Sequence, residues 1–233
     1  SDNGGNSMDY TYDGAGNVLT QTDELGRTAT YQYDQYGRLL KLTEADGSTT
    51  SYGYDVMDRI TAVTDAEGHR TTFTYDKVGN QLSMTEEDEA TYQYAYDKKD
   101  RVISQTNPLG ASSTFKYDGN DNVTEAADEN GTVTKYAYDK NDNLVSQTDG
   151  NGNTTTYQYD ELDRKIGETS PLKETNEYRY DAIGNLTKSK DPMGLITEYK
   201  YDSLSNLTEQ ISPKGAVTKY DYDKHGNVIS VTD

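Results

Sequence analysis

The chain has 233 residues, no cysteine and a formal net charge of −19, with a pI of about 4.4 and a mean hydropathy of −1.02. The absence of cysteine excludes disulfides, zinc–thiolate sites and a cysteine nucleophile. The acidic balance argues against nucleic acid as a partner, because its phosphates require clustered Lys and Arg. No apolar run approaches the roughly 18 residues of a membrane span, so we expect no membrane span in this segment.

The composition alone is typical of a disordered chain, since aliphatic residues are few and the charge is high. The 22 tyrosines change this expectation. Each supplies a large apolar ring with a polar tip, and a core of stacked rings can replace an aliphatic one. We therefore expect a folded, tyrosine-rich protein.

Taken in chain order, residues 1–7 form a polar lead, SDNGGNS, which we interpret as a linker or an added leader. From Met8 to Asp233 the chain repeats an aromatic-x-Tyr-Asp phrase every 21 residues, without insertion or deletion. Such a period indicates a repeat array in which each unit packs only against its neighbours. We expect residues 8–233 to be a single tandem array, excerpted from a longer chain. The aspartates of the phrase are Asp13, Asp34, Asp55, Asp76, Asp97, Asp118, Asp139, Asp160, Asp181, Asp202 and Asp223.

Each unit, numbered from its Asp as position 0, contains two predicted turns. The first covers positions 0 to 3, as in Asp34-Gln35-Tyr36-Gly37, and the second covers positions 10 to 13. Asp or Asn first and Gly fourth is what a type I hairpin turn prefers, because Gly takes positive φ. The four prolines support this pattern, since all lie at position 11, where φ near −65° is favoured. They are Pro108, Pro171, Pro192 and Pro213.

The segments between these turns are predicted strands. The first such pair is residues 17–22 in one unit and residues 27–33 leading into the next, both rich in the Thr, Val and Tyr that fit a pleated surface. Each unit is thus a β-hairpin, and its two aromatics at positions −3 and −1 point to one face. The other strand has adjacent apolar residues such as Leu39 and Leu40, so we expect both faces to be partly apolar.

The predicted fold is all-β: about eleven antiparallel 21-residue hairpins forming a continuous twisted or spiralling sheet. Repetition lines up the tyrosines as a ladder across it. The residues to which we assign this structural role are Tyr31, Tyr33, Asp34, Gly37, Tyr52, Tyr54, Asp55, Tyr75, Asp76, Gly79, Tyr94, Tyr96, Asp97, Tyr117, Asp118, Tyr136, Tyr138, Asp139, Tyr157, Tyr159, Asp160, Tyr178, Tyr180, Asp181, Gly184, Tyr199, Tyr201, Asp202, Tyr220, Tyr222 and Asp223.

Some units depart from the pattern. The Gly of the first turn is replaced by Asp in five units and by Ser205 in a sixth, and Asp tolerates the left-handed region better than Ser. The second turn loses its Gly at Glu89 and Lys173, and there we predict an altered turn.

The phrase YxYDxxGR/N, with a second Gly about ten residues on, resembles the YD repeat, or Rhs repeat. This repeat occurs in bacterial Rhs proteins, in the C-components of Tc toxins, in wall-associated proteins and in the teneurin adhesion receptors. The resemblance covers nearly the whole chain. It implies a spiralling β-strip that is the open part of a hollow shell, which in the bacterial proteins commonly encloses a C-terminal toxin. The stretch from Asp191 to Leu195 looks like a DPxGL signature of the shell's end, but it lies in register with the other second turns, so we interpret it as an ordinary turn.

A catalytic site would require a group of residues that departs from the repeat, and we find no such group in the sequence. The two histidines, His69 and His225, lie at different positions of units far apart in the chain, so we do not expect them to converge on a metal or a triad. We therefore assign no catalytic residue, no metal ligand and no cofactor. Rows of turn aspartates raise the alternative of Ca²⁺ binding, which we leave open while favouring their role as turn caps.

Two functions remain. The first is a non-catalytic structural segment of a secreted or surface-displayed bacterial protein, forming the wall of a β-shell around a C-terminal toxin cargo. Its partners are that cargo or flanking domains of the parent chain, with end-to-end self-association through terminal strands also open. The second is an adhesive or carbohydrate-binding module of a cell-surface protein, with the tyrosine ladder or the variable positions 1, 2, 7 and 14 as its surface.

Overall fold

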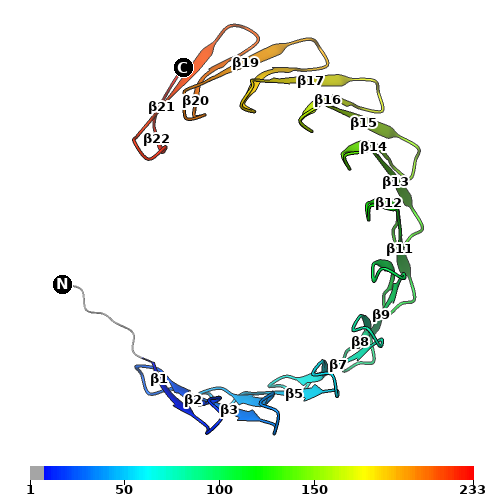
Figure 1. Cartoon of the computed structure of the whole chain (residues 1–233), viewed down its shortest axis with the longest axis vertical. Coiled ribbons are helices and arrows are strands. Elements are labelled where there is room, and N and C mark those ends of the chain that lie inside the picture. Colours follow the sequence, from blue (N-terminus) through cyan, green and yellow to red (C-terminus); the bar gives the residue numbers. More distant parts are fainter. Residues whose placement is uncertain (1–7) are drawn as a thin grey trace, which may run out of the picture. The chain divides into compact units, whose positions relative to one another are not determined.

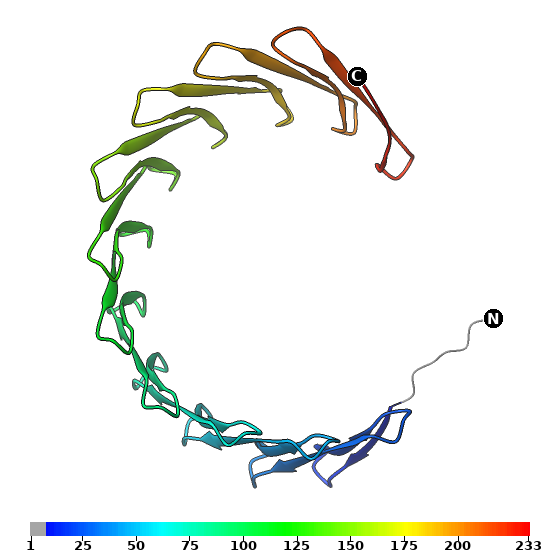
Figure 2. The same ribbon diagram turned by 180° about the vertical axis from the view of Figure 1, so that it is seen from behind.

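A computed structural model describes residues 8–233 of the chain as 22 antiparallel strands in one sheet, with no helix among them. The predicted all-β repeat array is therefore confirmed. The polar lead at residues 1–7 lies outside the described residues. No helix that could cross a membrane occurs in the described part. Figures 1 and 2 show from opposite sides how the hairpins follow one another in chain order.

The chain divides by its contacts into two units, residues 1–114 and residues 115–233, and the division falls inside one strand, β11. Within a unit the pairing is local, since strands next to one another in the chain are hydrogen-bonded neighbours. The strands from the N-terminal side up to the division are β1 (Asp9–Tyr12), β2 (Val18–Thr22), β3 (Thr28–Tyr33), β4 (Leu39–Thr43), β5 (Thr49–Tyr54), β6 (Ile60–Thr64), β7 (Arg70–Tyr75), β8 (Gln81–Thr85), β9 (Thr91–Tyr96), β10 (Val102–Thr106) and β11 (Ser112–Tyr117).

The second unit continues the same pattern. Its strands are β12 (Val123–Ala127), β13 (Val133–Tyr138), β14 (Leu144–Thr148), β15 (Thr154–Tyr159), β16 (Lys165–Thr169), β17 (Thr175–Tyr180), β18 (Leu186–Lys190), β19 (Ile196–Tyr201), β20 (Leu207–Ile211), β21 (Val217–Tyr222) and β22 (Val228–Thr232). Among the described residues β1 pairs only with β2 and β22 only with β21, so the sheet is open at both ends.

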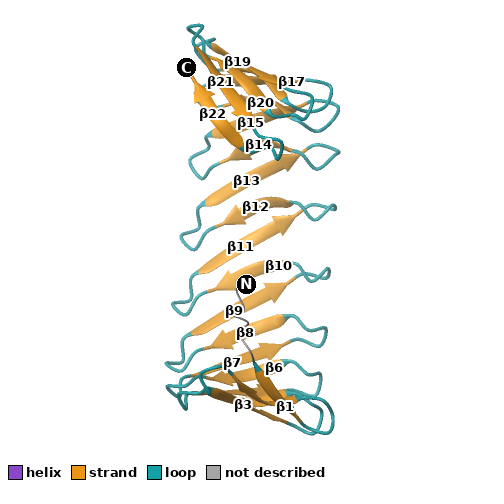
Figure 3. Cartoon of the chain, turned by 90° about the vertical axis from the view of Figure 1, so that its left-hand side faces the viewer, coloured by secondary structure: helices purple, strands orange, loops and turns teal. Residues whose placement is uncertain are grey.

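The first predicted turn is present in all eleven repeats and the second in the ten repeats that begin at Asp13 to Asp202, and consecutive turns lie at opposite edges of the strands (Figure 3). We call residues at positions 0 to 4 the signature turn and those at positions 10 to 14 the second turn. In one signature turn the N–H of Asp34 donates to the Arg38 carbonyl at 2.9 Å, and the N–H of Gly37 donates to the Asp34 carbonyl at 3.1 Å. Gly37 has a φ of 82°, as expected for a type I turn followed by a left-handed residue. The stretch from Asp191 to Leu195 makes the same two bonds, which confirms that it is an ordinary turn.

The predicted alteration of the two turns without Gly is wrong. Glu89 and Lys173 both take a φ of 67°, and their N–H groups donate to Glu86 and Ser170 at 3.1 and 2.9 Å, as Gly does elsewhere. Asp58 and Ser205 likewise adopt positive φ in the signature turn. The flanking strands fix the turn, so the side chain accepts a conformation costing about 1–2 kcal/mol at a non-glycine residue.

A β-bulge explains the strand with adjacent apolar residues. Tyr33 pairs with Leu39 but Gln32 pairs with Lys41, so Leu40 is an extra residue in β4. The same shift recurs at the corresponding place in other hairpins of both units. A bulge sets two residues opposite one and interrupts the alternation of faces. The Leu39–Leu40 pair is therefore a feature of the bulge.

The sheet has almost no conventional core. Of the hydrophobic side chains in residues 8–233, Ala62 alone is buried, at 8% exposure, while most strand residues are half-buried. The described part of the chain has no helix and no second sheet, so within it neither unit has a layer covering its strands. Stability must therefore come from contacts between successive hairpins.

Candidate functional site

In most repeats the tyrosine at position −1 links the hairpin around its own signature turn to the hairpin before it. The Tyr54 hydroxyl, on β5, donates to the Leu39 carbonyl on β4 at 2.9 Å. Tyr75 and Tyr96 make the equivalent bonds to Ile60 and Gln81 at 2.7 and 2.9 Å. In the second unit the same bond is made by Tyr138, Tyr159, Tyr180 and Tyr222. These hydroxyls form a ladder of inter-repeat hydrogen bonds.

Burial raises the pKa of several of these phenols. Desolvation is the main cause for Tyr54, Tyr96 and Tyr138, with the neighbouring tyrosine at position −3 contributing. A raised pKa keeps the hydroxyl protonated at neutral and mildly alkaline pH. It therefore remains a hydrogen-bond donor to the carbonyl.

The signature aspartate caps its own turn. Oδ1 of Asp55 accepts the N–H groups of Met57 and Arg59 at 2.8 and 3.1 Å, while Oδ2 accepts the Arg59 Nε–H at 2.7 Å. The Arg59 side-chain hydrogen bond is the largest of the effects that lower the pKa of Asp55. Asn takes the role of Arg in other repeats, as in Asn17 with Asp13. The carboxylate thus uses both oxygens within its own turn.

The residue at position 4 also reaches the next repeat. The Arg38 guanidinium lies 4.9 Å from the centroid of the Tyr54 ring, and its Nη1 donates to the Asp55 carbonyl at 2.9 Å. Arg59 lies in the same way over Tyr75, at 4.8 Å. An Arg stacked on an aromatic face is favoured electrostatically by the ring. The Arg38 side chain therefore contacts the aspartate of its own turn, the tyrosine of the next repeat and the backbone of the next turn.

Sequence reasoning missed the role of the aspartate that replaces Gly at position 3. Oδ1 of Asp58 accepts from Arg38 of the preceding repeat at 2.7 Å. Asp100 accepts from Asn80 at 2.7 Å, and Asp142 and Asp163 accept from the asparagines of the preceding turns. These aspartates are links between repeats as well as turn residues. Each of these aspartates lies 20 residues after the Arg or Asn that donates to it, and this constant spacing in the sequence could have predicted the link.

The predicted stacking of tyrosine rings on one another is mostly wrong. Tyr10 and Tyr12 stack with centroids 6.3 Å apart. Successive tyrosines at position −1 within a unit, such as Tyr54 and Tyr75, make no ring–ring contact in the described residues, and each of these two rings contacts an Arg guanidinium instead. The −3 tyrosines share the face of the −1 tyrosines but have looser partners, such as Tyr31 with Gln21 at 3.0 Å. The ladder is built from hydroxyls, guanidiniums and backbone carbonyls.

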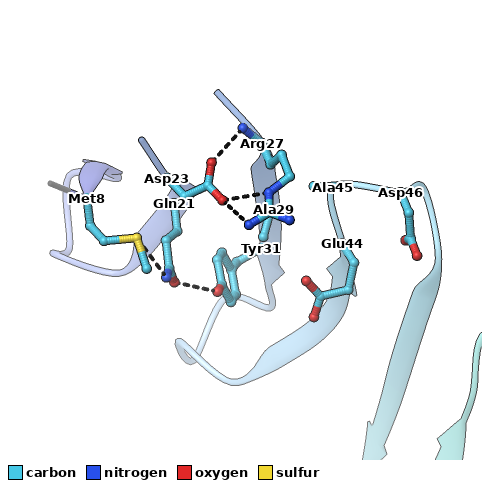
Figure 4. Close-up of a pocket in the computed structure, with 9 residues that line it drawn as sticks. All are labelled: Met8, Gln21, Asp23, Arg27, Ala29, Tyr31, Glu44, Ala45 and Asp46. Carbon is cyan, nitrogen blue, oxygen red and sulfur yellow. Dashed lines mark hydrogen bonds and ion pairs between the residues drawn. The ribbon is translucent and has the colours of Figure 1, made fainter. Parts of the chain in front are cut away.

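A hollow of about 650 Å³ lies at the second-turn edge of the first unit (Figure 4). Arg27 pairs with Asp23 at 2.7 Å on one side, and the carboxylates of Glu44 and Asp46 line the other. The Tyr31 hydroxyl and Gln21 lie at its floor. The hollow is open, with a lining that is more apolar than polar, and the lining contains no nucleophile–base pair.

The structure places the two histidines separately, one in each unit. His69 lies in a second turn with Asp65 and Glu67, and the ligand atoms of these three residues lie within 4.8 Å of one another. Sequence reasoning looked for a pair of histidines and overlooked this local Asp-x-Glu-x-His spacing. This group is the only set of three such residues found in residues 8–233.

The family model of the RHS repeat matches the chain at residues 12–49, 36–70, 58–91, 75–113, 96–133, 117–152, 138–175, 180–217 and 201–233. The repeating hairpin with its tyrosine and aspartate links defines a tandem YD-repeat sheet protein, and the chain belongs to the RHS-repeat family. The resemblance inferred from the sequence is confirmed.

Similar solved structures include TcdB2–TccC3–TEV and TcdB2–TccC3–Cdc42, with TM-scores of 0.69 and identities of 19% and 20%. TcdB2–TccC3 without its hypervariable C-terminal region has a TM-score of 0.68 and an identity of 19%. Each alignment covers 97% of this chain but only 14% of the other chain. At this identity the likeness establishes a shared fold. A comparison with curated proteins found no match.

Proposed function

We propose that this chain is a non-catalytic segment of the wall of a β-shell in a secreted or surface-displayed bacterial protein. The shell encloses or scaffolds a C-terminal cargo, which in relatives of this family is commonly a toxin. The partners are that cargo and the flanking domains of the same parent chain. The net charge of −19 supports the exclusion of nucleic acid.

The observation that carries this proposal is that stabilising contacts run along the sheet and leave both faces without a covering layer. Tyr54, Arg38 and Asp58 connect neighbouring hairpins at one edge, while within residues 8–233 Ala62 alone supplies a buried apolar side chain. A sheet that holds itself together from repeat to repeat can serve as a wall, because it needs no interior of its own.

The similar structures support the location of the cargo. This chain spans 14% of their length, and the names of two of these structures include Cdc42 and a hypervariable C-terminal region. By analogy we place the cargo of this protein C-terminal to the array. The fold supports the proposed role as a shell wall but does not identify a cargo, so the experiment tests the cargo.

The test uses the parent protein with the region that follows the array. We expect that region to resist a protease at concentrations that digest it when it is produced alone. The control is a parent protein in which Tyr54, Tyr75 and Tyr96 are all changed to Phe, which weakens the inter-repeat ladder and should restore cleavage. Equal digestion of the following region with and without the array would refute the enclosing role.

A second candidate is an adhesive module, favoured by a row of exposed apolar side chains at position 2 of the signature turns. In the first unit Tyr36, Met57 and Val78 are 73%, 58% and 72% exposed. Such a row on an otherwise acidic edge could contact a partner protein. Changing all three residues to Ser should abolish binding to target cells if adhesion is the function, and should leave protection of the cargo intact.

A further inference from the structure

A histidine-centred cluster occupies one second turn of the first unit. Nδ1 of His69 lies 3.1 Å from Oδ2 of Asp65 and 3.7 Å from Oε2 of Glu67. Its other nitrogen, Nε2, lies 3.3 Å from Oε2 of Glu87, which belongs to the second turn of the next hairpin. No other second turn of the chain combines an acidic residue at position 10, another at position 12 and a histidine at position 14.

We propose that Asp65, Glu67 and His69 bind a divalent first-row transition-metal ion of the zinc class, with Glu87 orienting the imidazole. Imidazole nitrogen and carboxylate oxygen are the ligands that such ions take at about 2.0–2.2 Å. Bonds of about 2.1 Å place tetrahedral ligands about 3.4 Å apart. The separations of 3.1 and 3.7 Å from Nδ1 lie on either side of that value.

The turn prepares the aspartate for this role. Oδ1 of Asp65 accepts the N–H groups of Glu67 and His69 at 3.0 and 2.9 Å. These bonds fix the carboxylate and leave Oδ2 directed at Nδ1 of His69, where a metal would replace the proton. The three residues are exposed, so the remaining coordination positions are open to water.

The different partners of the two ring nitrogens of His69 also fit a metal site. A metal-bound histidine ordinarily donates its other N–H to a carboxylate, which fixes the tautomer and raises the basicity of the ligand. Glu87 is placed to accept from Nε2 while Nδ1 faces the two ligand carboxylates. Because Glu87 comes from the next hairpin, metal binding would connect two repeats at this edge.

The surrounding charge attracts cations. The turn that contributes Glu87 reads Glu86-Glu87-Asp88-Glu89, four consecutive acidic residues. Such a field raises the local concentration of cations. Selectivity for the zinc class over Ca²⁺ comes from the ligand set, since Ca²⁺ takes six to eight oxygen ligands and does not favour imidazole.

The experiment titrates Zn²⁺ into the metal-free full chain and follows the imidazole signals by NMR, with calorimetry for the affinity. His69 and His225 are the only two histidines, so the second is an internal reference. We expect one equivalent of Zn²⁺ to shift His69 and leave His225 unchanged, and equal Ca²⁺ or Mg²⁺ not to displace it. Binding should persist in His225→Ala and disappear in His69→Ala.

Three further variants test the site independently of the His69 substitution. Asp65→Asn should weaken Zn²⁺ binding while keeping the turn, because Asn107 caps its own turn through the same two N–H bonds. Glu67→Gln should also weaken binding, and Glu87→Gln should weaken it about 10–100-fold. Circular dichroism checks that each variant is folded. Equal Zn²⁺ affinity in His69→Ala and the wild type, or parallel shifts of both histidines, would overturn the proposal, as would displacement by Ca²⁺.

Discussion

Removing the Tyr96 hydroxyl, by Tyr96→Phe, tests whether the ladder of hydrogen bonds holds successive hairpins together. The hydroxyl donates to the Gln81 carbonyl at 2.9 Å from a partly buried position. The substitution deletes one oxygen, keeps the ring and leaves the carbonyl without that donor.

The expected loss follows from the net value of a hydrogen bond in folding, about 0.5–1.5 kcal/mol. Water can partly replace the lost donor at this half-buried site, so we expect about 1 kcal/mol. For a chain of this size that loss corresponds to a fall in Tm of about 2–4 °C. In a repeat array the stability is a sum over repeats and over the interfaces between neighbouring repeats, so this loss weakens one such interface.

The matched control is Tyr94→Phe, two residues earlier on the same strand and on the same face. Position −3 is already Phe at Phe73 and Phe115, whereas position −1 is Tyr in all eleven repeats. No hydrogen bond joins the Tyr94 hydroxyl to another described residue, so its removal should change stability by less than about 0.5 kcal/mol. Urea and thermal unfolding, followed by circular dichroism, measure both variants. Equal losses for the two would show that the position −1 hydroxyl has no special role.

Other predictions follow from the turns. The pKa of His69 is raised above its ordinary value of 6.5, chiefly by its hydrogen bond to Asp65, with Glu87 and Glu67 adding to it. Its stabilising contribution is therefore present below pH 6.5 and is lost as the pH rises through the raised pKa. An NMR titration should place the midpoint above 6.5, and a midpoint at or below 6.5 would contradict the contacts seen. Hydrogen bonds from Arg lower the pKa of Asp55, Asp97 and Asp160, so their contribution is present above pH 3.8 and is lost as the pH falls through the lowered values. The array should lose sheet signal in acid below about pH 4, and a signal unchanged to pH 2 would disprove this. Lys173→Gly should raise stability by up to about 1 kcal/mol, because the backbone there has a φ of 67°; a lower unfolding midpoint would show that the turn is not strained.

The sequence by itself determined the hairpin, its two turns and the number of repeats. These features depend on residues within a few positions of one another, such as Asp34 and Gly37, whose backbone preferences act locally. The period of 21 residues then fixes the array, since each hairpin must pack on an equivalent neighbour. Glu89 and Lys173 show the limit of this reasoning, because there the flanking strands imposed the turn on residues that disfavour it.

The tertiary structure decided which side chains connect the repeats. Tyr54 bonds a carbonyl 15 residues earlier, and Arg38 bonds Asp58 20 residues later, because strand pairing brings neighbouring turns to the same edge. The bulge at Leu40 depends on a register that only the paired strands define. Contacts of this kind lie across strands, and the direction and reach of a side chain across a sheet are set by pairing rather than by spacing along the chain.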